Sequence, residues 1–298
     1  MKNNILDKHL VIDKEKCIHC GLCEKTCWNG ALKLGEDGLP KMEIDHLTDE
    51  WQMCWECQRC LAVCPTGALS ILGRTASDCL PRTMIPKPEA MEALITNRRS
   101  CRSYKDQNVD KGLIDRILHI AGNSPTGSCN QLVEYTVIDD KETMKEWVEL
   151  FHKELFDAAD SGIYPGRFTK EDIAFFRTKC EEGESFMFRG APHALFVHAP
   201  IGRGEWVYDT QIALTYVELL MESYGIGTIY VSTPGAALSI CPKSREFLGI
   251  PENHYITVPL GFGYPEYTFR RGVSRSDALK IHHLGGQAVP QFDAKVEK

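Results

Sequence analysis

The spacing of apolar residues beyond residue 88 follows two different periods. Apolar residues recur every three or four positions, as in amphipathic helices, in residues 89–99, 111–122 and 208–225. Short apolar runs with a β-rich character, typical of buried strands, occupy residues 134–140, 193–200 and 255–263. This mixture over about 210 residues, a plausible size for one core, predicts a single α+β domain.

The first 80 residues follow a different pattern. The segment ALKLGEDGLPKMEI predicts a hairpin in which Asp37-Gly38 supplies the positive φ of a tight turn. Pro81, Pro86 and Pro88 then withhold backbone donors and fix φ, so that neither a helix nor a central strand can run through this stretch. The sequence therefore predicts a first domain over residues 1–80, a linker over residues 81–88 and a second domain over residues 89–298.

Cysteines form an internal repeat in the first domain. Eight of the 13 cysteines fall in two copies of one spacing, Cys17, Cys20, Cys23 and Cys27, then Cys54, Cys57, Cys60 and Cys64. Zinc sites usually show two pairs of cysteines separated by a long loop, and disulfides are disfavoured in a reducing compartment. Three cysteines at every third position followed by a fourth favour iron–sulfur ligation, and predict two 4Fe-4S clusters.

Residues 9–73 resemble a bacterial two-cluster ferredoxin on the strength of these spacings. The resemblance implies that the fourth cysteine of each copy ligates the other cluster. One ligand set would then be Cys17, Cys20, Cys23 and Cys64, and the other Cys54, Cys57, Cys60 and Cys27. The first copy departs from the family pattern because Trp28 stands where the second copy has Pro65.

Composition and charge narrow the function classes without selecting a partner. With 43% hydrophobic and 25% charged residues, the 298-residue chain has the composition of a globular protein. No signal peptide is readable, and Glu218 and Glu222 interrupt the most apolar long stretch, so we expect a cytoplasmic protein without a membrane span. A net charge of −7 without basic blocks gives no indication of nucleic-acid binding.

Four segments of the second domain are each weak indications of a phosphate- or ring-binding site. Each also has an ordinary interpretation as a solvated helix end, a helix stop, a helix C-cap or a pair of solvated arginines. The segments are RRSCRSY (98–104), SPTGSCNQ (124–131), GIGTIYVSTPG (225–235) and PLGFGYPEYTFRR (259–271).

In this order and at these separations, the four segments resemble the nitroreductase family of FMN-dependent oxidoreductases over residues 89–285. The resemblance implies that Arg98, Arg99, Ser100 and Arg102 bind the FMN phosphate and ribityl chain. It implies further flavin contacts from Pro125, Thr126, Cys129 and Gln131, from Ser232 and Thr233 at the N5 edge, and from Arg270 or Arg271, with Arg271 favoured. Cys129 stands at the family's usual asparagine position and Asn130 follows it, so either side chain could contact the flavin.

Other candidate groups have plainer interpretations. Cys101, Cys129 and Cys241 fall within or near the implied site, but a free cysteine is most often a small buried hydrophobe. His193, His198 and His254 lie in strand-like stretches, where core or interface roles are expected. The sequence therefore assigns no catalytic residue.

The two resemblances together predict a fusion of a ferredoxin and a nitroreductase. Electrons from a low-potential donor such as a ferredoxin would pass through two 4Fe-4S clusters to FMN and then to an electron-poor small molecule such as a nitroaromatic. The reverse flow, from NAD(P)H as the donor through FMN to the clusters, is an alternative. The nitroreductase resemblance implies a homodimer with two FMN molecules at its interface. Alkene reduction, reductive dehalogenation, and an electron carrier or redox sensor without its own substrate remain alternatives.

Overall fold

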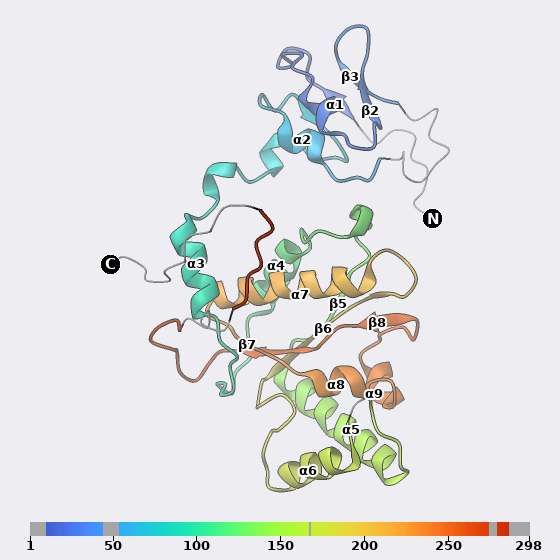
Figure 1. The fold of residues 1–298 in the computed structure, drawn as a ribbon, viewed down its shortest axis with the longest axis vertical. Coiled ribbons are helices and arrows are strands. Elements are labelled where there is room, and N and C mark those ends of the chain that lie inside the picture. The colour runs from blue at the N-terminus through green and yellow to red at the C-terminus, as the bar shows by residue number, and fades with distance from the viewer. Residues whose placement is uncertain (1–9, 44–53, 167, 274–278, 286–298) are drawn as a thin grey trace. The chain divides into compact units, whose positions relative to one another are not determined.

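The computed structural model describes residues 10–43, 54–166, 168–273 and 279–285 of this chain (Figure 1). The chain divides into two compact units. The first comprises Met1–Pro86 together with Gly127–Asn130, and the second comprises Lys87–Thr126 and Gln131–Lys298. The division after Pro86 lies inside the predicted linker, whose limits at residues 81 and 88 stay a prediction. None of the helices in the described ranges is long and apolar enough to cross a membrane.

The first unit is built from short elements. Its helices are α1 (Leu22–Thr26) and α2 (Arg59–Val63), and its strands are β1 (Val11–Ile12), β2 (Leu32–Leu34), β3 (Pro40–Met42) and β4 (Leu69–Ser70). Strand β1 pairs with β4 and β2 pairs with β3, both antiparallel. The buried residues Leu32, Leu61, Leu69 and Ile71 form a small core of their own. Short 3-10 turns at Ala76–Asp78 and Arg82–Met84 follow.

The predicted hairpin between the two cysteine repeats is confirmed. Leu32 lies opposite Met42 and Leu34 lies opposite Pro40 in the β2–β3 ladder. Gly38 has a φ of 73°, the left-handed conformation that a glycine adopts without a steric penalty. The Asp37 carboxylate accepts from the Leu39 backbone N–H at 3.2 Å and so closes the turn.

The second unit is a larger α+β domain. Its helices are α3 (Pro88–Asn97), α4 (Lys111–Ala121), α5 (Lys141–Asp160), α6 (Lys170–Glu181), α7 (Trp206–Ser223), α8 (Ser232–Ala237) and α9 (Pro242–Phe247). Its strands are β5 (Glu134–Ile138), β6 (His193–Pro200), β7 (Gly227–Tyr230), β8 (His254–Ile256) and β9 (Leu260–Gly263).

These five strands form one antiparallel sheet in the order β5-β6-β9-β7, with β8 also paired to β6. The sequence predicted one strand over residues 255–263, and that prediction is wrong because the stretch forms two strands, β8 and β9. Pro259 lies between them and cannot donate to a ladder. Helices α3, α4 and α7 correspond to the three predicted helices, whereas α5, α6, α8 and α9 were not predicted.

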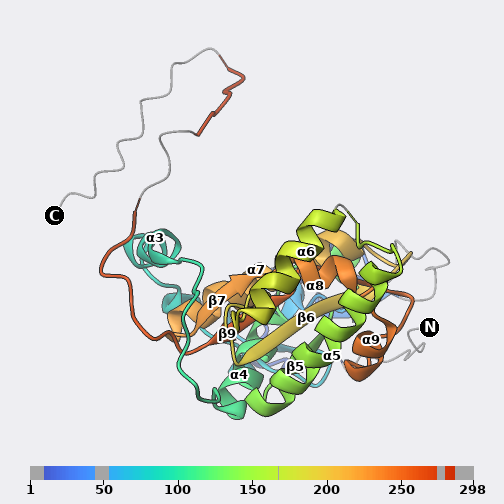
Figure 2. The same cartoon turned by 90° about the horizontal axis from the view of Figure 1, so that it is seen from below.

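Helices cover both faces of this sheet (Figures 1 and 2). Along the buried strand β6, Ala194 and Phe196 belong to one core cluster, together with residues of α5 and α6. Leu195 and Val197 belong to a second cluster, together with residues of α4 and α7. Because successive side chains of a strand point to opposite faces, β6 anchors both cores. This layered arrangement confirms the α+β class predicted from the sequence.

Candidate functional site

Two cavities in the first unit collect the cysteines of the repeats. One is lined by Cys17, Cys20, Cys23 and Cys64, and the other by Cys27, Cys54, Cys57 and Cys60. Each cavity thus takes three cysteines from one copy and the fourth from the other. These groupings are the same as the two ligand sets expected from the sequence.

The backbone of the two copies repeats the same turns. His19 and Gly21 in the first copy, with φ of 54° and 70°, occupy positions equivalent to Glu56 and Gln58 in the second, both with φ of 57°. Left-handed residues on either side of Cys20 and Cys57 turn the chain sharply before α1 and α2 begin. Residues other than glycine rarely adopt this backbone conformation. Its presence at His19, Glu56 and Gln58 indicates a backbone that is fixed by the site.

The four thiols of the second cavity lie close together, and their mutual repulsion indicates what kind of group the cavity can hold. Burial, together with the neighbouring thiols of Cys54, Cys57 and Cys27, raises the pKa of Cys60 to about 11. Four thiolates this close repel one another unless positive charge lies between them, and thiolate-bound iron supplies such charge. None of the 13 cysteines, all within the described residues, forms a disulfide. The residues present therefore fit a thiolate-bound cluster.

Cys64 lies in an environment that favours the thiolate. Burial would raise its pKa, but the backbone N–H groups of Leu69, Thr66 and Ala68 and the Thr66 hydroxyl together hold it below its ordinary value. The Thr66 Oγ1 lies 3.8 Å from the Cys64 Sγ. Donors around a sulfur stabilise its anionic form, which is the form that binds metal.

Two tryptophans adjoin the second cavity. Trp28 and Trp55 both line it, and their ring centroids lie 5.4 Å apart at an interplanar angle of 45°. Trp28, which stands where the second copy has Pro65, keeps 71% of its surface exposed. The substitution noted in the sequence therefore places a largely exposed indole beside the cysteine set of the second cavity.

A third cavity, in the second unit, gathers part of the predicted flavin site. Arg99 and Arg102 line it, together with Glu222, Gly227, Pro265 and residues 267–269. The Cys101 N–H donates to the Thr228 carbonyl at 2.7 Å and so ties this segment to β7. A Cβ at Gly227 would lie 2.7 Å from the Cβ of Cys101, so only glycine permits this approach.

Arg98 is engaged elsewhere. Its Nη1 lies 3.1 Å from the Oε1 of Glu218, whose side chain is 7% exposed, and the Tyr230 hydroxyl donates to the other carboxylate oxygen at 2.8 Å. Removing Arg98 would leave the buried Glu218 carboxylate without its counter-charge. Arg98 therefore binds Glu218 in this structure and is not among the residues that line the cavity.

The late arginines lie next to the same stretch of chain. Arg270 and Arg271 are exposed and follow directly after Phe269, which lines the cavity. A Cβ at Gly272 would lie 2.9 Å from the carbonyl oxygen of Thr96, and Arg99 donates to the Val273 carbonyl at 2.6 Å. The structure thus brings the two predicted arginine segments side by side.

The other two predicted segments do not line this cavity. Ser232 and Thr233 begin α8, and Thr233 is buried. In the turn after α4, Ser128, Cys129 and Gln131 all have φ near 50°, and the Gln131 N–H donates to the Thr126 Oγ1 at 3.1 Å. Within the described residues, the predicted contacts in these two segments are therefore not among the residues that line the cavity with Arg99 and Arg102.

Three further candidate side chains, His193, Cys101 and Cys241, have structural roles. His193 is fully buried and its Nε2 accepts from the Val109 N–H at 2.9 Å. Cys101 and Cys241 are also buried, and burial, followed by the charge of Glu154, raises the pKa of Cys241 to about 12. A thiol with so high a pKa is a poor nucleophile at neutral pH.

Sequence reasoning missed two acidic residues of this region. Glu218 pairs with Arg98, and Glu222 lines the cavity with a pKa raised above its ordinary value, chiefly by burial. Both had been used only as evidence against a membrane span. Their spacing of four residues on a predicted helix was a readable signal, because it places both carboxylates on one face.

Comparison with known proteins assigns both units. The model of the nitroreductase family matches residues 95–264, and a model described as a 4Fe-4S dicluster domain matches residues 16–68. Nitroreductase NfnB of Mycolicibacterium smegmatis is 26% identical over 60% of this chain and 85% of its own length. A ferredoxin of Pyrobaculum islandicum is 34% identical over 27% of this chain and 64% of its own length.

Solved structures agree with the fold of the second unit. The crystal structure of a nitroreductase with bound FMN from Bacteroides fragilis superposes with a TM-score of 0.52 at 20% identity, covering 66% of this chain and all of that one. A nitroreductase with bound FMN from Desulfitobacterium hafniense gives a TM-score of 0.51 at 24% identity, with the same coverage. Since the family model spans more than half of its length, the chain belongs to the nitroreductase family, and it carries an N-terminal 4Fe-4S dicluster domain.

Proposed function

We propose that this protein is an FMN-dependent oxidoreductase that takes up electrons through two 4Fe-4S clusters and delivers them to an electron-poor small molecule such as a nitroaromatic. The observation that carries the proposal is the pairing, in one chain, of a nitroreductase domain with two complete cysteine quartets. Iron–sulfur clusters exchange single electrons, whereas a flavin can accept single electrons and release a pair. The fusion would convert a one-electron supply into two-electron reduction.

The chain's own residues have distinct parts in this proposal. Each cysteine quartet would hold one cluster. Arg102 and Arg99, with Arg270 or Arg271, would hold the FMN phosphate, because guanidinium groups bind phosphate through charge-assisted hydrogen bonds. Backbone N–H groups at Ser232 and Thr233 would face the ring. Arg98 would position this region through Glu218.

We also propose that the active form is a homodimer. Tyr208, Ile212 and Tyr216 lie four residues apart on α7 and remain 67%, 37% and 42% exposed. Residues at this spacing share one helix face, and an apolar stripe of this kind is typical of an interface. The nitroreductase resemblance implies the same assembly, in which a second copy would complete the flavin site. Light scattering of the purified chain measures the assembly directly.

The electron route is tested by removing one cysteine. Cys64→Ala should damage the first cluster while FMN still binds, because the predicted flavin contacts all lie beyond residue 97. Nitroaromatic reduction driven by reduced ferredoxin should then collapse, whereas the dithionite-reduced variant should still reduce the nitro compound. Donor-driven turnover and rapid-mixing absorbance measure the two halves.

Cys79→Ala is the matched control, because Cys79 is an exposed cysteine outside both repeats. It should keep full turnover with either reductant. Full ferredoxin-driven turnover in a Cys64→Ala protein shown to lack the cluster would contradict the route. Activity with an alkene or a halogenated compound but not with a nitroaromatic would redirect the substrate assignment. A reduced protein that no acceptor reoxidises would indicate an electron carrier.

A further inference from the structure

Three side chains outside both sites share one face of the sheet. Glu134 on β5 lies directly opposite His198 on the neighbouring strand β6. On the other side of β6, His198 lies opposite Ile256 of β8, and His254 precedes Ile256 by two positions. Because strand side chains alternate between faces, the register points Glu134, His198 and His254 to the same side.

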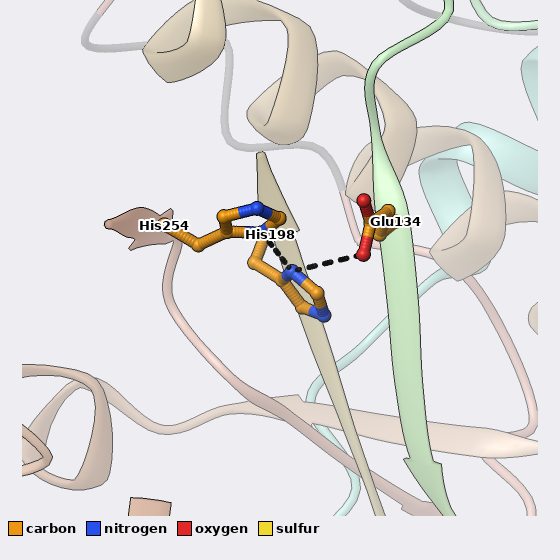
Figure 3. Close-up of side chains that lie close together, drawn as sticks. All are labelled: Glu134, His198 and His254. Carbon is orange, nitrogen blue, oxygen red and sulfur yellow. Dashed lines mark hydrogen bonds and ion pairs between the residues drawn. The ribbon is translucent and has the colours of Figure 1, made fainter. Parts of the chain in front are cut away.

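The polar atoms of these side chains converge (Figure 3). The Nδ1 atoms of His198 and His254 lie 2.9 Å apart, and the His198 Nδ1 lies 4.0 Å from the Glu134 Oε2. One ligand atom from each of the three residues lies within 4.8 Å of the other two. Both imidazoles are buried, whereas Glu134 is exposed and gives the group access to solvent.

Neighbouring residues hold both rings in place. The Thr136 Oγ1 lies 3.0 Å from the His198 Nε2, so the hydroxyl can accept a hydrogen bond from Nε2–H. The lone pair of the His198 Nδ1 then accepts from the His254 Nδ1–H, a proton that a bound metal ion would displace. Arg245 of α9 donates to the carbonyls of Pro251 and His254, which fixes the turn that carries His254. A hydrogen-bonded second nitrogen is the usual support of a histidine that binds metal.

Charge in this region is compatible with a cation. Neutral imidazole is the form that binds metal. The positive charge of Arg245 disfavours a bound cation. The Glu134 carboxylate, the acidic side chain of the trio, counters that charge.

We propose that Glu134, His198 and His254 form a binding site for a divalent transition-metal ion, with Zn²⁺ as its best match. Two imidazole nitrogens and one carboxylate oxygen suit zinc, which binds them at about 2.0 to 2.2 Å. Tetrahedral ligands at such bond lengths lie roughly 3.3 Å apart, between the 2.9 and 4.0 Å found here. Both histidines would bind through Nδ1 and keep the proton on Nε2, and water would fill the fourth position.

The test uses the full chain with both clusters assembled, so that the cysteine quartets are already occupied. Zn²⁺ is added anaerobically, and binding is measured by competition with a chromophoric chelator and by metal analysis after gel filtration. The wild type should bind about one Zn²⁺ per chain more than His254→Gln does. Glu134→Gln should weaken binding by at least about tenfold, since loss of even a ligand's supporting partner costs that much.

Glu134→Gln is the decisive variant because its exposed side chain can be changed without opening the core. His119→Gln, an exposed histidine on α4, is the matched control and should bind Zn²⁺ like the wild type. Zn²⁺ should also raise the Tm of the wild type but not that of Glu134→Gln. Equal Zn²⁺ affinity in the wild type and folded Glu134→Gln, or no binding by the wild type, would overturn the proposal.

Discussion

The three arginines of the RRSCRSY segment differ in the number of ion pairs and hydrogen bonds that each already makes. Arg98 is paired with a buried carboxylate at 3.1 Å, and Arg99 donates to three backbone carbonyls, of Thr96, Arg98 and Val273. Among the residues that the structure describes, Arg102 makes only a 3.4 Å hydrogen bond, to the Ser100 carbonyl, while it lines the cavity. Arg102 therefore has the most hydrogen-bonding capacity left for a phosphate.

We expect Arg102→Ala to weaken FMN affinity by roughly ten- to a hundredfold, because a hydrogen bond to a charged group contributes about 1.5 to 3 kcal/mol. Flavin fluorescence titration measures the affinity, and the iron content should not change. Arg203→Ala, an exposed arginine in the loop before α7, is the control and should bind FMN normally. Unchanged FMN affinity in Arg102→Ala would mean that other residues bind the phosphate.

Among the elements, α5 depends on a well-formed N-cap. The Asp140 carboxylate accepts from the N–H groups of Glu142 and Thr143 at 3.1 and 3.0 Å, and Asn108 donates to its other oxygen at 3.0 Å. The hydrogen bond from Thr143, followed by that from Asn108, lowers the pKa of Asp140 to about 2. The helix that begins here buries Trp147 and Phe151 in the larger core.

Asp140→Ala should lower the Tm by a few degrees, as expected for the loss of an N-cap. Because the folded pKa lies below the unfolded value of 3.8, the carboxylate stabilises the fold fully above about pH 4. That stabilisation is lost as the pH falls towards 2. Thermal unfolding followed by circular dichroism should thus show the same Tm difference at pH 7 and pH 5. Asp140→Asn, which keeps a hydrogen-bond acceptor, should lower the Tm less than Asp140→Ala.

What the sequence could predict depended on how local each signal is. The cysteine sets were readable because their spacing lies within eleven residues, and β6 was readable as an apolar run. Helix α5 carried a signal that went unused, since Met144, Trp147, Phe151 and Leu155 recur at helical spacing. The Arg98–Glu218 pair joins residues 120 positions apart. Strand register alone brings Glu134 to His198, and no local pattern encodes it.

For the whole molecule, the cores are separate. One buried cluster holds only residues of the first unit, and the two larger clusters hold only residues of the second. A unit that owns its core can fold alone. We expect residues 87–298 to fold and bind about one FMN per chain without iron, whereas the full chain carries about eight iron atoms in addition. Iron and flavin analysis measures the content of each cofactor. A folded fragment without FMN would contradict the assignment of the flavin site to the second unit.

The crossing of the fourth cysteines between the repeats also bears on how this chain tolerates change over generations. Each cavity is completed by the other copy, through Cys64 in one case and Cys27 in the other. A deletion confined to either copy would therefore remove cysteines from both cavities. The two copies depend on each other, so neither can be lost without damage to both sets. A single copy with the same geometry would hold three cysteines of one set and would need a second molecule to supply the fourth.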